Sequence, residues 1–307
     1  MKVYHSIEEF QQVKGAVVTT GTFDGVHVGH RKIINRLNEI ARKIDGESVL
    51  LTFHPHPRMV LFPDDHGLEL ITTMDEKIQL LEDAGIDNLI IHPFTKEFSR
   101  KTSLEFIREV LVEKIGTSVL VIGYDHHFGR NREGSFEHLK ESGPLYGFKV
   151  EEISVQDVDD VAVSSTKIRN ALHEGDVMTA SKYLSYQFQL KGTVVHGDKL
   201  GRKIGFPTAN IQVDSDTKLI PANGVYGCYV LLGEEKFKGM LNIGMRPTVN
   251  GEERRIEVHV FDLNREFYGE SITLILKDRI RDEKKFDSVE QLKERLAIDK
   301  NLAERML

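Results

Sequence analysis

Over about the first 183 residues, short apolar runs alternate with segments whose apolar residues recur at helical spacing. The apolar runs are typical of buried strands, and the helical spacing within the segments between them is typical of amphipathic helices. This alternation predicts a parallel α/β sheet. The expected strands are residues 16–20, 48–53, 88–91, 118–123 and 148–154, and the expected helices include 74–84 and 103–112, the second capped by Ser103.

From about residue 186 the pattern changes to short β-rich runs separated by Gly, Asn and Asp. No helix-length pattern appears before residues 288–306. The second half therefore reads as a small antiparallel barrel closed by one helix. The expected strands are residues 189–195, 224–232, 236–243, 255–261 and 271–276. We expect two domains, residues 1–185 and 186–307.

The first expected strand leads into a glycine-rich turn that places His27 and His30 three residues apart at a helix start. This spacing directs both imidazoles from one face of the helix. Free backbone N–H groups and the positive end of the helix dipole meet at the same point, which favours a phosphate chain. A lone histidine there is more often a cap or a solvated residue, but the strand and turn favour binding. The other expected site residues are Gly21, Phe23, Asp24, Gly25 and Gly29.

A second helix start, at Ser164, Ser165 and Thr166 with Arg169 one turn on, offers hydroxyls, free amides and positive charge. Alone it reads as a well-capped helix. Paired with the histidine turn, it would supply a second set of positive groups for a bound phosphate chain. Asp125, after the strand at 118–123, would hold Mg²⁺ or a ribose hydroxyl, or would cap a turn.

The segment 197–210 is a loop rich in Gly and basic residues. Its backbone amides can wrap phosphates, with Gly201, Lys203 and Gly205 as the expected contacts. Thr208 and Asn210, two apart in an extended chain, point the same way and suit a shared Mg²⁺. A hairpin loop with a turn-forming Asn fits the same residues. Glu257 lies in an alternating strand, where it is either a general base or a solvated charge.

Composition narrows the possible partners. The 307 residues carry a net charge of −7 without a Lys/Arg cluster, which disfavours a nucleic-acid partner. The single cysteine, Cys228, forms no disulfide within the chain and reads as a buried small hydrophobe. No apolar stretch has the length of a membrane span, and no signal peptide is evident, so we expect a cytoplasmic protein. Neither a P-loop nor a Gly-x-Gly-x-x-Gly motif occurs.

Together these motifs resemble the bacterial bifunctional riboflavin kinase/FAD synthetase (FMN adenylyltransferase) family over nearly the whole chain. Residues 21–30 resemble the nucleotidylyltransferase signature, and residues 164–169 and 205–210 match Ser-Ser-Thr-x-x-Arg and Gly-Phe-Pro-Thr-Ala-Asn. The resemblance implies a Rossmann-like nucleotidylyltransferase domain followed by a riboflavin-kinase barrel. After Gly123 the chain departs from the family pattern.

The resemblance also implies two reactions. The barrel would phosphorylate riboflavin with ATP, with Thr208 and Asn210 holding Mg²⁺ and Glu257 accepting the ribityl proton. The first domain would transfer AMP from ATP to FMN, giving FAD and pyrophosphate, with His27 and His30 stabilising the α-phosphate. The partners would be ATP, riboflavin and FMN, and the chain a monomer or weak homo-oligomer. The implied flavin contacts are Asn223, Tyr226, Arg281 and Glu283.

Two alternatives remain. In the first, the chain would be a nucleotidylyltransferase of another small substrate with a flavin-binding regulatory barrel. In the second, it would be a non-enzymatic flavin- or RNA-binding regulator. Thr208, Asn210 and Glu257 weigh against the first, because regulation needs neither a magnesium site nor a base. His27 and His30, together with the acidic net charge, weigh against the second.

Overall fold

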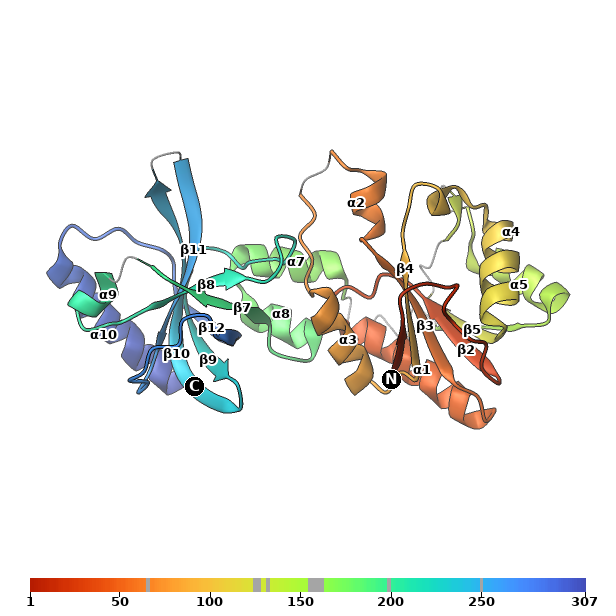
Figure 1. Ribbon diagram of the computed structural model, residues 1–307, viewed down its shortest axis with the longest axis horizontal. Helices are drawn as coiled ribbons and strands as arrows, with labels where there is room; N and C mark the ends of the chain where they lie inside the picture. Colours follow the sequence, from red (N-terminus) through yellow and green to blue (C-terminus); the bar gives the residue numbers. More distant parts are fainter. Residues whose placement is uncertain (65–66, 124–127, 131–132, 154–162, 198–199, 249–250) are drawn as a thin grey trace. The chain divides into compact units, whose positions relative to one another are not determined.

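The computed structural model describes the chain except residues 65–66, 124–127, 131–132, 154–162, 198–199 and 249–250 (Figure 1). It forms two compact units, Met1–Ser164 and Ser165–Leu307. No helix among the described residues is long and apolar enough to cross a membrane.

The first unit contains a six-stranded sheet, and all of its strand pairs are parallel, as the sequence predicts. The order across the sheet is β1-β4-β3-β2-β5-β6. The short strand β1 was not expected. The strands are β1 (Lys2–Tyr4), β2 (Ala16–Thr20), β3 (Ser48–His54), β4 (Asn88–Pro93), β5 (Thr117–Gly123) and β6 (Lys149–Ile153).

Helices connect these strands (Figure 1). The expected cap at Ser103 is wrong: Thr102 caps this helix, because its hydroxyl accepts from the Glu105 N–H while the Glu105 carboxylate accepts from the Thr102 N–H. The helix continues from α4 into the π-helix η2. The helices are α1 (Val28–Lys43), α2 (Pro57–Leu61), α3 (Met74–Asp83), η1 (Phe98–Arg100), α4 (Ser103–Glu105), η2 (Phe106–Ile115) and α5 (Phe136–Tyr146).

The strand order fixes where a ligand is expected in this unit. From β2 the chain adds β3 and then β4 on one side, and β5 then pairs with β2 on the other side. The order therefore reverses between β2 and β5, and ligands of such sheets bind at the carboxyl ends of the strands at that reversal. The histidine turn follows β2 directly. Asp125, just past β5, lies outside the described residues.

The second unit is a closed antiparallel barrel of order β10-β11-β8-β7-β12-β9, which confirms the predicted barrel. The strand β8 was not expected, because it directly follows the glycine-rich loop. The elements are α7 (Ser165–Glu174), α8 (Val177–Leu184), β7 (Gln189–Val195), α9 (Leu200–Lys203), β8 (Ala209–Val213), β9 (Gly224–Leu232), β10 (Glu235–Thr248), β11 (Gly251–Val260), β12 (Ser271–Arg281) and α10 (Val289–Met306).

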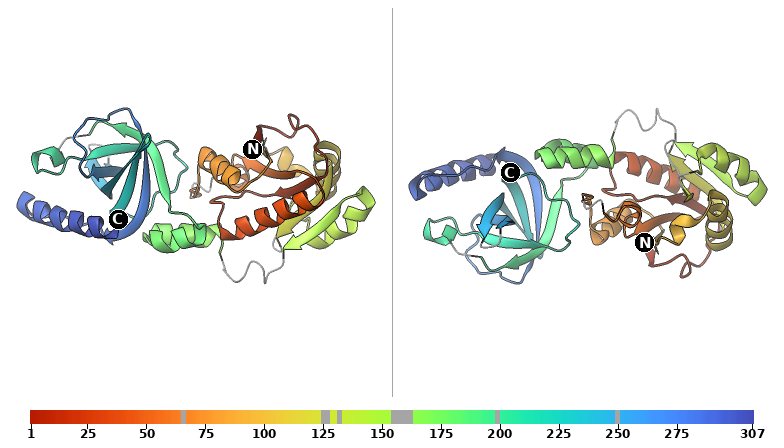
Figure 2. Two further views of the ribbon diagram at one scale, coloured as in Figure 1. Left: turned by 90° about the horizontal axis from the view of Figure 1, so that it is seen from below. Right: turned by 90° about the horizontal axis from the view of Figure 1, so that it is seen from above.

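Both ends of the second unit pack on the barrel. The helix pair α7–α8, expected in the first domain, bonds to barrel segments: Ala222 N–H donates to Leu172 O at 2.9 Å. The terminal helix α10 runs along the barrel (Figure 2) and places Ala303 in an apolar cluster with Met240 and Phe261. Cys228 is fully buried, as expected, and burial raises the pKa of its thiol.

Candidate active sites

The turn between β2 and α1 brings the two histidines into contact. The Nδ1 atom of His27 accepts from the His30 backbone N–H at 3.4 Å, so His27 is the N-cap of α1. The two imidazole rings stack with centroids 3.6 Å apart and an interplanar angle of 16°. The capping role and the shared face expected from the sequence are therefore both present in one pair.

The protonation of this pair follows from its surroundings. Burial, followed by the charges of His27 and Lys77, holds the pKa of His30 well below its ordinary value. His30 is therefore neutral at pH 7. Because Nδ1 of His27 accepts a hydrogen bond, the proton of a neutral His27 ring lies on Nε2. The Nδ1 atom of His30 is buried without a hydrogen-bond partner among the described residues. The pair can offer ring N–H groups to an anion.

The backbone of the turn is unusual. Phe23 and Val26 have positive φ angles of 47° and 39°, and Gly25 has 83°. Positive φ is a genuine outlier for a β-branched residue such as Val26. Asp24 is buried, and its carboxylate accepts from the backbone N–H groups of Ile71 and Thr72, each at 3.1 Å. The structure thus directs the Asp24 carboxylate toward the segment before α3.

The second expected anion-binding segment forms the first turn of α7, which begins at Ser165. Ser164 precedes the helix, and Thr166 is exposed. Ser165 and Arg169 are four residues apart and so share one face of the helix. By packing, α7 belongs to the second unit. Joint phosphate binding by this helix start and the histidine turn stays a prediction.

The strongest arrangement in the barrel is a row of polar residues across three neighbouring strands. Glu257 on β11 pairs in register with Asn210 on β8 and with Asn242 on β10. Residues in direct register project from the same face of a sheet, so these three side chains are neighbours. All three are half-buried. A carboxylate between two amides is a suitable place to hold a hydroxyl group.

The glycine-rich segment lies against this row. A Cβ at Gly197 would collide with the side-chain amide of Asn210, and one at Gly201 would collide with Phe206 O and come within 3.3 Å of the Thr208 hydroxyl. The backbone therefore passes directly over Thr208 and Asn210. Gly205 has a φ of +85°, which explains why glycine stands there. These contacts place two oxygen-bearing side chains beneath a loop that can bind phosphate.

The donors at this place fit Mg²⁺. A hydroxyl and an amide oxygen are hard ligands, and Mg²⁺ bound to a nucleotide takes few ligands from the protein. Among the described residues, no group of three or more His, Cys, Asp or Glu side chains is placed to hold a metal ion. A hydroxyl and an amide oxygen would leave most of the coordination sphere of a Mg²⁺ ion to other ligands, such as phosphate oxygens.

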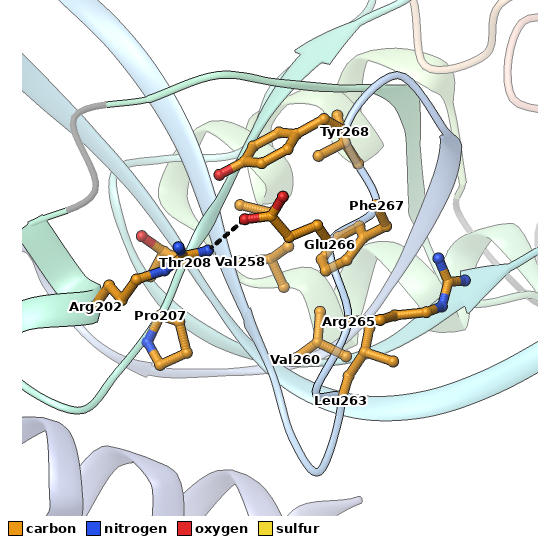
Figure 3. Close-up of a pocket in the computed structure, with 12 residues that line it drawn as sticks. Arg202, Pro207, Thr208, Val258, Val260, Leu263, Arg265, Glu266, Phe267 and Tyr268 are labelled. Atoms are coloured by element: carbon orange, nitrogen blue, oxygen red, sulfur yellow. Dashed lines mark hydrogen bonds and ion pairs between the residues drawn. The ribbon is translucent and has the colours of Figure 1, made fainter.

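Beside Thr208 the barrel has a pocket of about 460 Å³ (Figure 3). Across it, an Nη atom of Arg202 lies 3.0 Å from a carboxylate oxygen of Glu266, as an ion pair. The ring centroids of Tyr268 and His196 are 4.1 Å apart. Glu266 and Tyr268 lie in the loop between β11 and β12, and they were not expected because no motif marks this loop.

The four expected flavin-contacting residues lie in two different environments. The Asn223 amide donates to the Glu283 carboxylate at 3.2 Å, and Met245 N–H donates to the same carboxylate at 3.2 Å. Arg281 donates through Nε to buried Asp299 at 2.8 Å. Tyr226 is fully buried: its hydroxyl donates to Ala222 O, and burial raises its pKa. The structure therefore places Tyr226 in the core.

A Rossmann-like sheet with a histidine turn, followed by a barrel with a glycine-rich loop beside a carboxylate, fits a two-domain transferase of phosphate-containing groups. Comparison with known proteins gives the family. Residues 9–167 match the FAD synthetase model and residues 184–307 the riboflavin kinase model. The chain belongs to the bifunctional riboflavin kinase/FMN adenylyltransferase family, and it is an enzyme with both domains.

The relatives match along nearly the full chain. The bifunctional riboflavin kinase/FMN adenylyltransferase of Escherichia coli K12 is 38% identical, covering 97% of this chain and 96% of its own. That of Bacillus subtilis 168 is 36% identical, covering 98% and 95%. A crystal structure from Streptococcus pneumoniae, described as a macrolide-efflux protein, is 33% identical with a TM-score of 0.89, covering 98% of both chains.

Proposed function

We propose that this chain converts riboflavin to FMN at the barrel and FMN to FAD at the histidine turn, using ATP in both steps. The observation that carries the proposal is the Asn210–Glu257–Asn242 row in a chain that also holds the stacked His27–His30 pair. A regulatory flavin-binding barrel would not require a carboxylate in register with a candidate metal ligand.

At the barrel, Glu257 accepts the proton of the ribityl 5′-hydroxyl as that oxygen attacks the γ-phosphorus of ATP. The bond from the γ-phosphorus to the oxygen of the β-phosphate breaks, and ADP leaves. Thr208 and Asn210 would hold Mg²⁺, which would supply positive charge beside the transferring phosphates. The backbone at Gly201, Lys203 and Gly205 binds the phosphates. Three of the expected flavin contacts, Asn223, Arg281 and Glu283, lie at the ends of β9 and β12 and suit the flavin side.

At the histidine turn, an oxygen of the FMN phosphate attacks the α-phosphorus of ATP, and the bond to the β-phosphate breaks to release pyrophosphate. His27 and His30 donate N–H groups to the α-phosphate oxygens as their charge grows. The backbone from Gly21 through Gly29 orients the phosphates. Ser164, Ser165, Thr166 and Arg169 bind the departing pyrophosphate.

We further propose a cytoplasmic enzyme that is a monomer or weak homo-oligomer. One buried cysteine fits a reducing compartment, because the chain depends on no disulfide for its stability.

The direct test is to incubate the full chain with riboflavin and MgATP, without added FMN, and to separate the flavins by chromatography. FMN should appear first and FAD afterwards, and EDTA should stop both. Riboflavin that binds but stays unphosphorylated, with no FAD formed from added FMN, would instead favour the nucleotidylyltransferase with a regulatory barrel.

A further inference from the structure

A segment 47 to 55 residues away in sequence braces the histidine turn. Hydrogen bonds join residues 22–25 to residues 71–77. Three involve Thr72: its N–H and its hydroxyl both donate to Asp24, and its Oγ1 accepts from Gly25 N–H at 3.1 Å. A hydroxyl donates one hydrogen bond and accepts another, so this one group ties a side chain and a backbone amide of the turn together.

A further hydrogen bond from the same segment comes from Lys77 on α3. Its ammonium donates to Thr22 O at 2.8 Å, and the side chain is almost completely buried. Burial lowers the pKa of Lys77, and the charge of Asp24 opposes this shift. Burying a lysine ammonium costs free energy unless the charge is paired. Here the Thr22 carbonyl accepts a hydrogen bond from the ammonium, and the negative charge of Asp24 offsets part of the cost.

The turn needs such bracing. Positive φ angles at Phe23 and Val26 strain the backbone, and such conformations persist only where the surroundings over-determine them. Without the hydrogen bonds from Thr72 and Lys77, the turn would relax toward an ordinary conformation. His27 and His30, which follow it directly, would then lose the stacked arrangement.

We propose that Thr72 and Lys77 are positioning residues for adenylyl transfer, and that Asp24 serves the site as their partner rather than as a ligand of the nucleotide. This inference rests on the proposed function of the histidine turn. Neither Thr72 nor Lys77 needs to touch substrate. They act by holding the backbone of residues 22–25, and through it the two imidazoles, in the geometry of the transition state.

The test compares Thr72→Val with Thr72→Ser in the full-length enzyme, because Val keeps the shape and loses the hydroxyl whereas Ser keeps the hydroxyl. Steady-state formation of FAD from FMN and ATP is measured alongside riboflavin kinase activity. For Thr72→Val we expect kcat of FAD formation to fall about tenfold to a hundredfold. KM for ATP should stay within about threefold of the wild-type value. Thr72→Ser should remain close to wild type in both.

Lys77→Met is the second variant, and it should lower kcat of FAD formation in the same way. Circular dichroism during heating has to show each variant folded at the assay temperature, which separates mispositioning from unfolding. Equal losses in Thr72→Val and Thr72→Ser, or full activity in both Thr72→Val and Lys77→Met, would overturn the inference. Failure of the proposed function looks different, because the wild-type enzyme would then form no FAD from FMN.

Discussion

The two sites of this chain are held in place by different means. In the first unit, the functional groups stand at a backbone turn with positive φ at Phe23 and Val26, and buried polar side chains from residues 71–77 hold that turn. In the second unit, Glu257 stands inside a regular ladder, and its neighbours Asn210 and Asn242 come from adjacent strands in register. Main-chain hydrogen bonds fix the geometry there.

This difference predicts how each site fails. A site on a strained turn depends on a few side-chain hydrogen bonds, so single substitutions remote in sequence should change its rate. A site on a ladder shares the stability of the barrel, so substitutions nearby should change stability and rate together. The two activities on one polypeptide serve as internal controls for each other.

The largest loss of activity should come from a substitution in the barrel ladder. Glu257→Gln keeps the shape and removes the base, so riboflavin phosphorylation should fall by about 10²–10⁴-fold. Conversion of added FMN to FAD should stay near the wild-type rate, because the first unit is untouched. Both are measured by chromatography of the flavins. A kinase rate above about a tenth of wild type would refute the base assignment.

His27→Asn is the reciprocal test at the turn. Asparagine is a good N-cap, so the variant keeps an acceptor for the His30 N–H but loses the imidazole. FAD formation should fall about a hundredfold or more while FMN accumulates from riboflavin. If the rate instead survives, the histidine serves only as the helix cap, which is the less specific interpretation of this motif.

The same contrast between local and distant contacts explains which features of the fold and of the candidate sites the sequence predicts. Periodicity defines elements from local residues, and β2, β7 and β9 have the predicted bounds. Motif residues such as His27 and Asn210 are also recognisable, because each signature is contiguous. The capping position was misassigned by one residue, since Ser103 and Thr102 are both good caps and only the partner Glu105 decides between them.

Residues that act across long sequence separations could not be found in this way. Thr72 lies 47 residues from Gly25, and Lys77 lies 55 residues from Thr22. A lysine in an amphipathic helix gives no sign that it will be buried beneath a turn. Asp299 likewise looks like one charge among many on α10, although it is fully buried against a barrel arginine. Such contacts depend on the packing of whole elements.

A smaller effect is expected at Asp299, which accepts from Arg281 at 2.8 Å and from Arg295 at 2.9 Å. Asp299→Asn leaves two arginines without a charged partner, and breaking a buried pair costs roughly 3–5 kcal/mol. The barrel should unfold at lower temperature, and KM for riboflavin should rise because Arg281 is released. Lys14→Ala removes an exposed ion pair with Asp45 and should cost less than about 1 kcal/mol. Equal losses in the two variants would show that Asp299 contributes no more than a surface charge.

The smallest expected difference between the two units is in how much stability each loses in acid. Burial is the main cause of the lowered pKa of His30, His92 and His259, and of these described histidines the first two lie in the first unit. Below the ordinary value of 6.5 the unfolded chain binds protons that the folded histidines do not, so stability decreases as the pH falls through that value.

The carboxylates act in a lower pH range and in the same direction. Hydrogen bonds from Lys43 and then Arg36 lower the pKa of Glu39 to about 2, and Glu105 and Glu109, also in the first unit, have lowered pKa values as well. Their contribution is present above the ordinary value of 4.5 and is lost below it as the folded carboxylates become protonated. Hydrogen exchange measured from pH 7 to pH 4 should therefore show the sheet around β2 and β5 opening before the barrel. Earlier exchange in the barrel would mean that the ladder, rather than the braced turn, is the more acid-sensitive construction.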